Sequence, residues 1–373
     1  MSNLPIAFAL LGVLYALFAL ILLAGWSQLP IFKAKKTEPQ TRISIILAAR
    51  NESLHITNCV NALLAQDYPK NLLEIIVVND RSEDDTAERV HALIPSAAHA
   101  LHLIDMQEGQ GKKQALAKGI EVATGELIVT TDADCTMGEQ WISTLAAYFE
   151  EHQPDLLMGP VIMAPTLHFF QRIQALEFTG ILGSGAALCG LRAPLYGNGA
   201  NLAYRKKSYQ EAGGFASHQH LSSGDDMLLI QSIKARKGKI AFIRSTDALV
   251  KTVPAKDLAN FWQQRLRWTG KNFRVLSPLA IGIGLFVFTS NVAVLASPIL
   301  FMLLPALRIA IFIFLLLRGL SDLLLLHSFS GLMKNKGLLF LLLPALFFSS
   351  AYSILVALGA AFIKPHWKGR IVN

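Results

Sequence analysis

Three aspartates follow apolar runs in the first half of the chain, at positions where carboxylates can bind a cation. Asp80 ends the run 73–80, and Asp132 and Asp134 end the run 126–134. Two carboxylates one residue apart after a buried strand repel each other, and a divalent cation relieves that repulsion. Mg²⁺ is typically held by one or two carboxylates together with substrate phosphates. The pair therefore predicts a metal site for a phosphorylated ligand, although aspartates at strand ends also cap the helix that follows.

Two further groups of charged residues stand at the starts of helical patterns. Lys112 follows Gly111 and opens the pattern KKQALAKGIEVA, and a glycine turn that enters a helix can bind phosphate. Solvated lysines at a helix start explain Lys112 equally well. Asp225 and Asp226 precede the helical pattern 227–235, where carboxylates commonly cap a helix. These residues alone leave both alternatives open.

Short apolar runs alternate with helical patterns through the middle of the chain. Such runs indicate a largely parallel sheet that is covered by helices on both faces. Ligands of such sheets bind at the carboxyl ends of the strands, so we expect the three aspartates at one edge. The chain has no G-x-G-x-x-G after the first run and no G-x-x-x-x-G-K-[ST], which argues against a dinucleotide enzyme and a P-loop NTPase. The five predicted strands are 43–49, 73–80, 100–106, 126–134 and 155–163.

The two ends of the chain are strongly apolar. Hydrophobic residues make up 53% of the 373 residues and charged residues 16%, against about 45–50% and about 25% in soluble chains. Residues 1–32 carry no charge, are long enough to cross a bilayer and lack the basic start of a signal peptide. In the C-terminal block we expect about three spans, with a short apolar stretch, 321–331, as an interfacial or re-entrant piece or part of a fourth span. The three spans are predicted near 277–297, 299–319 and 338–362.

These patterns divide the chain into an N-terminal anchor (1–32), a soluble domain (41–274) and a C-terminal membrane region with a short basic tail (275–373). Lysines directly after the first span favour a cytoplasmic soluble domain, in agreement with three scattered cysteines. The tail, with Lys368 and Arg370, favours a cytoplasmic C-terminus, whereas three C-terminal spans would put it outside. The net charge of +8 does not indicate nucleic acid, because the cations are scattered or lie at membrane edges.

The motifs of the middle domain resemble those of the family 2 glycosyltransferases, in the order in which that family has them. They begin with ISIILAARNES, IIVVNDRSEDDT, GKKQALAKGI and GELIVTTDADC, and continue with YGNGANLAYRK, EAGGF, SGDDMLL and QQRLRW. The resemblance covers about residues 42–270. It is greatest to membrane-anchored members, the group with cellulose, chitin, hyaluronan and poly-N-acetylglucosamine synthases.

This resemblance implies a GT-A fold and an inverting transfer of a sugar from a nucleotide-sugar donor, usually a UDP-sugar. The acceptor would be a hydroxyl of a membrane-associated molecule: a glycolipid, a lipid-linked glycan or a growing polysaccharide. Glu52 and Asp80 match nucleoside-contacting residues, and Asp132 matches an acid near the ribose and diphosphate. Asp134 matches the ligand of Mg²⁺ or Mn²⁺, and Asp132 of the same motif is the second candidate ligand.

The resemblance also assigns the chemical step. Attack by an acceptor hydroxyl needs a base, and base catalysis contributes about 10²–10⁴-fold. Asp226 matches that base, although the sequence has Gly-Asp-Asp where Glu-Asp is usual, so Asp225 could share or replace the role. Gln264, Arg267 and Trp268 match the Q-x-x-R-W segment that closes over the diphosphate and acceptor near the membrane. A second departure is Ala48, which stands where a proline is usual.

Two other classes of protein remain as alternatives. A metal-dependent nucleotidyltransferase can share the fold and the metal site, but it needs neither the SGDD base nor Q-x-x-R-W before a membrane block. A non-catalytic membrane partner in polysaccharide export would have lost some acidic motifs, whereas all of them are present. A glycosyltransferase is therefore the favoured hypothesis.

Overall fold

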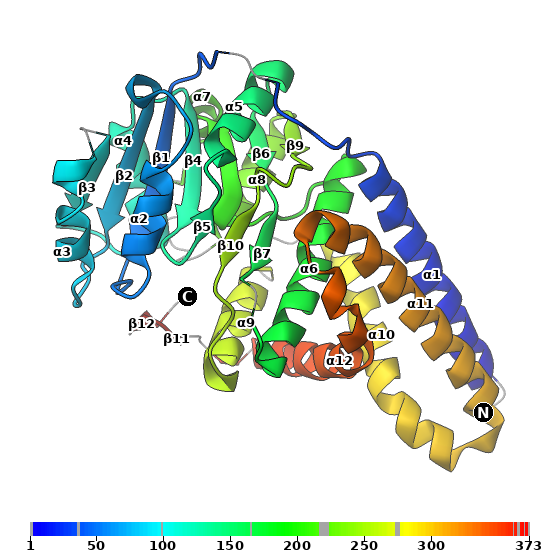
Figure 1. Ribbon diagram of the computed structural model, residues 1–373. Helices are drawn as coiled ribbons and strands as arrows, with labels where there is room; N and C mark the ends of the chain where they lie inside the picture. The colour runs from blue at the N-terminus through cyan, green and yellow to red at the C-terminus, as the bar shows by residue number, and fades with distance from the viewer. Residues whose placement is uncertain are drawn as a thin grey trace. The chain divides into compact units, whose positions relative to one another are not determined.

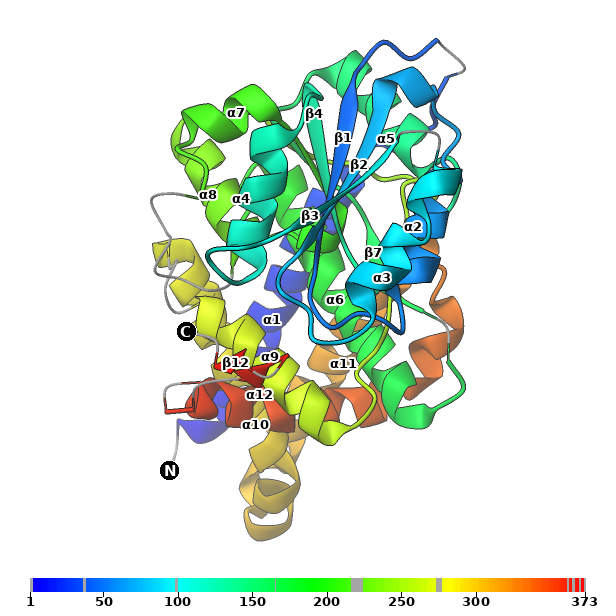
Figure 2. The ribbon, with the colours of Figure 1, turned by 90° about the vertical axis from the view of Figure 1, so that its left-hand side faces the viewer.

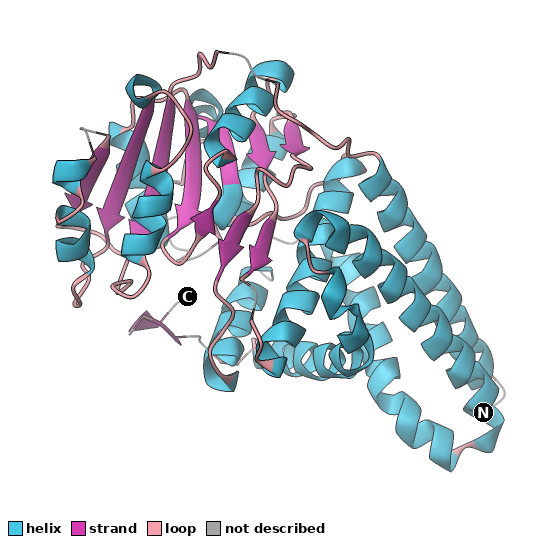
Figure 3. Ribbon diagram, in the orientation of Figure 1, coloured by secondary structure: helices cyan, strands magenta, loops and turns pink. Residues whose placement is uncertain are grey.

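The chain forms two compact units in a computed structural model. The helical unit comprises 1–28, 165–188 and 254–365, and the sheet unit comprises 29–164, 189–253 and 366–373. Helices alone make up the first, and the strands belong to the second (Figure 3). The structure describes all residues except 1–2, 36–37, 98–99, 165, 216–223, 273–276, 361, 364–365, 369 and 372–373, so the expected boundaries at 274 and 275 lie outside the described residues.

A seven-stranded sheet forms the centre of the sheet unit, in the order β3-β2-β1-β4-β8-β6-β9 (Figure 1). The four strands on one side are parallel, and β8 runs antiparallel to both β4 and β6. The expectation of a mostly parallel sheet is confirmed. The strands are β1 (Ile43–Ala49), β2 (Leu73–Asn79), β3 (Leu101–Asp105), β4 (Leu127–Asp132), β6 (Leu156–Met158), β8 (Leu202–Arg205) and β9 (Ile240–Phe242).

Helices cover both faces of this sheet, as the apolar strands require. Every residue of β1 except Ala48 is buried, and β2 is buried apart from Glu74. Figure 2 shows α4, α7 and α8 on one face and α2, α3 and α5 on the other. The helices are α2 (Ile56–Leu64), α3 (Thr86–His91), α4 (Lys112–Val122), α5 (Trp141–His152), α7 (Lys206–Glu211) and α8 (Asp225–Ala235).

The predicted strand 155–163 is two strands in two different sheets. β6 pairs within the main sheet, whereas β7 (Val161–Met163) joins a three-stranded sheet with β5 (Thr136–Met137) and β10 (Val250–Thr252). Gly159 and Pro160 separate them. A Cβ on Gly159 would come within 2.3 Å of the Asn201 side chain, and Pro160 has no N–H for a ladder hydrogen bond. The chain therefore changes sheets at this pair.

The helical unit contains four helices that are long and apolar enough to cross a membrane, in the described part of the chain. They are α1 (Leu4–Ser27), α10 (Pro278–Leu303), α11 (Arg308–Met333) and α12 (Leu342–Gly359). The stretch 321–331, expected as a separate piece, continues α11 without a break. α12 runs across the direction of α1 and α11 in both views (Figures 1 and 2). The unit also holds α6 (Phe169–Gly190) and α9 (Leu258–Asn272).

A polar cluster lies inside the helical unit among the apolar helices. Arg318 of α11 pairs with Asp322 one turn later at 2.9 Å, and Tyr15 of α1 donates to the same carboxylate at 2.8 Å. Arg318 also donates to Ser290 of α10 at 2.6 Å. Because a charged group between apolar helices is stable only when it is paired, this cluster fixes α1, α10 and α11 against one another.

Candidate active site

The acidic residues predicted from the sequence lie at one edge of the main sheet. β1 pairs in parallel with β2 and with β4, with Ala48 opposite both Val78 and Asp132. When this register is continued past the strand ends, Arg50 is level with Asp80 after β2 and with Asp134 after β4. The shared register places Asp80, Asp132 and Asp134 at the edge where ligands of parallel sheets bind.

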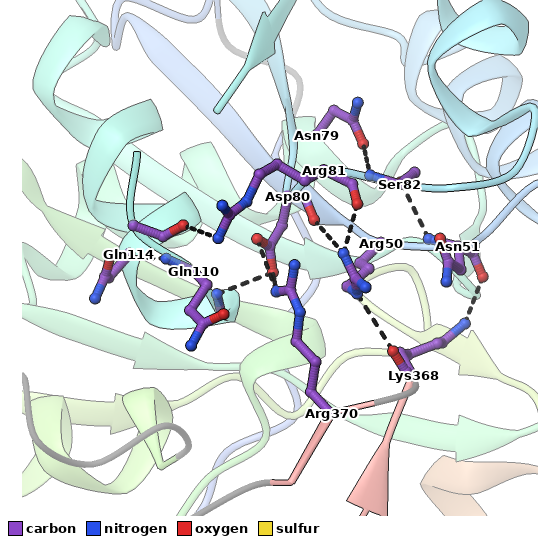
Figure 4. A network of polar contacts seen from close by, with 12 residues as sticks. Arg50, Asn51, Asn79, Asp80, Arg81, Ser82, Gln110, Gln114, Lys368 and Arg370 are labelled. Carbon is purple, nitrogen blue, oxygen red and sulfur yellow. Dashed lines mark hydrogen bonds and ion pairs between the residues drawn. The ribbon is translucent and has the colours of Figure 1, made fainter. Parts of the chain in front are cut away.

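Asp80, at the end of β2, is buried and fully supplied with donors. Its side chain is only 2% exposed. Oδ2 accepts from the backbone N–H of Gly111 at 2.9 Å, just before α4 begins. Nη1 of Arg370, near the C-terminus, lies 3.1 Å from Oδ1 and 2.9 Å from Oδ2 (Figure 4). A residue 290 positions away thus provides the positive charge beside this carboxylate.

Glu52, after β1, has a second cation from the same C-terminal segment. Lys368 Nζ lies 3.1 Å from Glu52 Oε1 and donates to the carbonyl oxygen of Asn51 at 2.7 Å. Burial is the main reason that the pKa of Glu52 is raised to about 7, and the positive charge of Lys368 opposes the shift. The negative charges of Asp134 and Asp132 raise that pKa further. Glu52 therefore lies within electrostatic reach of the pair after β4.

The loops after β1 and β2 are locked together by Arg50. This buried guanidinium donates to the carbonyl oxygen of Asp80 at 3.0 Å (Figure 4). It also pairs with Glu83 at 2.8 Å. Its Nε donates to the carbonyl oxygen of Lys368 at 3.3 Å. Asn51 directly follows Arg50, and Arg81 directly follows Asp80. Both have positive φ values, 49° for Asn51 and 52° for Arg81. Such backbone strain in non-glycine residues persists only where the surroundings enforce it, and it often marks functional loops.

The pair after β4 has a different environment. Asp132 forms an ion pair with Lys112, the first residue of α4. Asp134 is half-buried, and its Oδ2 accepts from the Thr252 hydroxyl of β10 at 3.2 Å. Burial, followed by the negative charge of Asp132, raises the pKa of Asp134. Within the described chain no lysine or arginine forms an ion pair with Asp134, and the positive charge of His55 only partly opposes the rise in its pKa.

The donor set after β4 fits a hard divalent cation. Two carboxylates one residue apart, one of them without a cationic partner, are oxygen ligands of the kind that Mg²⁺ and Mn²⁺ prefer. No group of three or more Asp, Glu, His or Cys side chains that could hold a metal occurs among the residues described. A cation here would therefore take further ligands from a bound phosphate or from water, as Mg²⁺ usually does.

Asp225 and Asp226 are the first two residues of α8. Gly224 precedes them with φ of +95°, a left-handed conformation that glycine adopts without strain. Asp226 is half-buried, and its Oδ1 accepts from the backbone N–H of Met227 at 2.8 Å. The side chain of Asp225 lies outside the described residues. The position is compatible with a cap and with a base, so both roles stay predictions.

Gln264, Arg267 and Trp268 lie on α9, in the helical unit. There the Trp268 ring packs under the guanidinium of Arg265, 4.3 Å from its centroid. Arg265 is buried and forms an ion pair with Glu177 of α6. The structure therefore brings Glu52, Asp80, Asp132, Asp134 and Lys112 together in one unit, while the three α9 residues belong to the other.

Comparison with known proteins identifies the domain that carries these residues. The family model described as "Glycosyl transferase family 2" matches residues 44–211. These residues form a family 2 glycosyltransferase domain. The match contains Glu52, Asp80, Lys112, Asp132 and Asp134, and it ends before Asp226 and α9.

Curated relatives of the chain agree with the assignment of this domain. Glycosyltransferase AglE of Haloferax volcanii is 32% identical over 119 residues, 32% of this chain and 39% of that protein. Poly-beta-1,6-N-acetyl-D-glucosamine synthase of Staphylococcus epidermidis is 24% identical over 243 residues, 63% of this chain and 55% of that protein. The matches thus cover less than two thirds of each of these relatives.

A solved structure shares the fold of the chain over almost its entire length. It is a mannosyltransferase from Pyrobaculum calidifontis, in complex with GDP-Man and Mn²⁺. The TM-score is 0.56 at 18% identity, covering 96% of this chain and 99% of the other. At this identity the likeness shows the fold alone, a GT-A type.

Three residues at the candidate site, Arg50, Lys368 and Arg370, are not predicted from the sequence. Lys368 and Arg370 were interpreted only as part of a basic tail, yet both pair with predicted donor-binding carboxylates. Basic residues at the end of a membrane region are ordinarily explained by the positive-inside bias. No local sequence pattern links them to Asp80. Arg50 was also missed, because an arginine after a buried strand carries no specific signal.

Proposed function

We propose that the protein is an inverting glycosyltransferase that moves a sugar from a nucleotide-sugar donor, a UDP-sugar, to a hydroxyl of a membrane-associated acceptor. The observation that carries the proposal is the family 2 domain, with Asp80, Asp132 and Asp134 at one edge of its sheet. Carboxyl ends of parallel strands are where such sheets bind nucleotides. The GDP-Man in the complex of the Pyrobaculum mannosyltransferase supports a nucleotide sugar as the class of donor.

In the proposed reaction the acceptor oxygen attacks the anomeric carbon of the donor sugar. The new carbon–oxygen bond forms as the bond to the nucleoside diphosphate breaks, with inversion and an oxocarbenium-like transition state. Asp226 takes the proton of the attacking hydroxyl, with Asp225 as the alternative base. The nucleoside diphosphate leaves with the bonding electron pair. Glu52 and Asp80 belong to the nucleoside end of this site, and Lys112 to its phosphate end.

Asp134 and Asp132 are the residues that would hold Mg²⁺ or Mn²⁺ together with the donor diphosphate. A cation in that position supplies Lewis-acid stabilisation of the negative charge on the leaving group. The likeness to a fold solved with Mn²⁺ and the uncompensated charge of Asp134 support this assignment. Gln264, Arg267 and Trp268 are proposed to close over the diphosphate and acceptor, because Arg267 offers a planar fork for phosphate oxygens.

The experiment that tests the activity uses the full-length protein in detergent with membrane lipids, Mn²⁺ and a panel of labelled nucleotide sugars. Transfer of label into a solvent-soluble product indicates a glycolipid or lipid-linked glycan, and label in an ethanol-insoluble product indicates a polymer. Release of pyrophosphate with label in a new nucleotide sugar would instead identify a nucleotidyltransferase. Asp247→Asn is the matched control, because Asp247 is an exposed aspartate of the same unit.

We further propose that the protein is a multi-pass membrane protein with its sheet unit in the cytoplasm. The four apolar helices and the lysines after α1 support this orientation. The contacts of Lys368 and Arg370 with Glu52 and Asp80 support a C-terminus on the same side as the sheet unit. An even number of the helices α10–α12 would then cross. Since α12 runs across α1 and α11, we propose that α10 and α11 cross and that α12 lies along the membrane.

Labelling of single cysteines with an impermeant reagent in intact cells tests this topology. In a variant that lacks the three native cysteines, a cysteine at Lys207 should stay unlabelled, because this exposed residue belongs to the sheet unit. A cysteine at Met302, exposed at the end of α10, should react from outside. The reverse pattern would overturn the orientation, and an unreactive Met302 position would overturn the crossing of α10.

A further inference from the structure

The C-terminal hairpin joins the sheet unit at the predicted donor site. The preceding residues, 254–365, belong to the helical unit, but β11 (His366–Trp367) and β12 (Arg370–Ile371) belong to the sheet unit. Figure 4 shows Lys368 and Arg370 reaching the loops after β1 and β2. Five polar contacts join these two residues to Arg50, Asn51, Glu52 and Asp80.

These contacts cancel the negative charge of two buried carboxylates. The side chains of Asp80 and Glu52 are 2% and 14% exposed. Without Lys368 and Arg370, this edge would present Glu52, Asp80, Asp132 and Asp134 to a ligand that is itself an anion. Lys112 is already paired with Asp132. The hairpin therefore makes the edge less repulsive to a nucleoside diphosphate.

A nucleotide could either displace Arg370 from Asp80 or bind beside it. Displacement would leave a buried carboxylate without a counter-charge, which is strongly unfavourable. A nucleobase offers only uncharged N–H donors in return, so it cannot replace the guanidinium charge. Binding beside an Arg370–Asp80 pair that remains intact avoids this loss.

Arg370 keeps donors for such a ligand. Among the described residues only Nη1 of its guanidinium is engaged, while Nε and Nη2 make no hydrogen bond there. The side chain is 23% exposed, so these donors are accessible. A guanidinium fixed at one nitrogen presents its remaining N–H groups in a rigid plane, a geometry that matches phosphate or carbonyl oxygens.

We infer that the C-terminal hairpin is part of the donor site, in which Arg370, held by Asp80, donates to the nucleoside diphosphate and Lys368 neutralises Glu52. The inference rests on the proposed function and extends it, because it assigns donor binding to residues that follow the membrane region. Donor binding then requires Lys368 and Arg370.

Equilibrium binding of UDP and of GDP to the full-length protein, each with Mn²⁺, tests the inference without transfer activity. Arg370→Gln should weaken binding on the order of 10–100-fold, the effect of losing a hydrogen bond to a charged group. Arg370→Lys should recover only part of the loss, because lysine restores the charge but not the planar fork. Arg236→Gln is the control, since Arg236 is an exposed arginine of the same unit that pairs only at 3.9 Å.

Hydrogen exchange of the wild-type protein gives a second measurement that needs no variant. Nucleotide with Mn²⁺ should slow amide exchange in the peptide covering 366–371. Faster exchange, or tighter binding by Arg370→Gln, would show that the hairpin is displaced and acts as a plug. Unchanged exchange with unchanged binding would make the hairpin structural and overturn the inference while the proposed function stands. A wild-type protein that binds neither nucleotide would overturn both.

Discussion

The ends of β2 and β4 lie at the same edge of one sheet, yet their carboxylates have opposite charge balances. Asp80 is buried and accepts from a backbone N–H and from Arg370. Asp134 has a hydroxyl partner, and its pKa is raised by burial and by the charge of Asp132. The first carboxylate is compensated by the chain itself. The second has no lysine or arginine partner among the described residues, and a divalent cation from solution would compensate it.

This difference separates two parts of the proposed donor site. A carboxylate paired with arginine keeps its conformation whether or not a ligand is present. A fixed group of this kind suits the predicted binding of the nucleoside. A pair with excess negative charge favours a divalent cation and, through it, a diphosphate. The predicted functions of the two strand ends, nucleoside binding and metal binding, thus correspond to their different electrostatics.

Removing the carboxylate at the β4 end should have the largest effect. Asp134→Ala should lower the rate of transfer by about 10³-fold, because Lewis-acid stabilisation of the leaving group contributes several kcal/mol. The measurement is the initial rate with the best donor of the panel, with and without EDTA. Activity that resists EDTA, or a variant within about tenfold of wild type, would contradict the metal assignment. Asp247→Asn should leave the rate unchanged.

A carboxylate outside both strand ends should affect chemistry but not binding. Asp226→Asn should reduce transfer by about 10²–10⁴-fold, since an amide keeps the cap but accepts no proton. Binding of UDP with Mn²⁺, measured by calorimetry, should stay within about threefold of wild type. An active Asp226→Asn enzyme together with an inactive Asp225→Asn enzyme would move the base to Asp225. Loss of nucleotide binding in both variants would assign the pair a structural role.

The strand ends and the sheet could be predicted from the sequence because the signals are local. The runs 43–49 and 73–80 are largely apolar and rich in β-branched residues, which predicts their burial in a parallel sheet. The break between β6 and β7 could not be seen, because it depends on the Asn201 side chain that fills the space beside Gly159. The sequence does not show that the stretch 321–331 continues α11, because Arg318 and Asp322 lie at its boundary with the preceding apolar run, whereas in the structure these two side chains pair one turn apart.

The site was predictable only where its residues follow neighbouring strands. Asp80, Asp132 and Asp134 share an edge because parallel strands all end there. Arg370 contacts Asp80 across 290 positions, and nothing local to either residue specifies the contact. Charge pairs between distant segments depend on the path of the whole chain, so the compensation of the β2 end appears only in the structure.

Removing Glu52, whose pKa is raised by burial and by the two carboxylates of the β4 end, should change how stability depends on pH. The pKa of Glu52 is raised from 4.5 to about 7, so the folded state binds the proton more tightly than the unfolded state. This contribution to stability is complete below about pH 4.5 and is lost as the pH rises through about 7. Between these two pH values the free energy of unfolding of the wild type should fall by up to roughly 3 kcal/mol relative to that of Glu52→Gln. Parallel curves of unfolding midpoint against pH for the two proteins would show that Glu52 titrates normally.

The smallest effect should come from Lys112, and its sign differs between two ligands. Lys112 and Asp132 are 20% and 37% exposed, so solvent screens their ion pair and a change of about tenfold or less is expected. Lys112→Gln removes the cation that pairs with Asp132 at the β4 end. Mn²⁺ alone should therefore bind more tightly to Lys112→Gln, because the local charge is more negative. UDP with Mn²⁺ should bind more weakly, because a phosphate contact is lost.

Lys118→Gln is the matched control for Lys112→Gln, since Lys118 lies on the same helix but pairs with Glu121. If the Lys112 and Lys118 variants behave alike with both ligands, Lys112 is a solvated lysine at a helix start and has no part in the donor site.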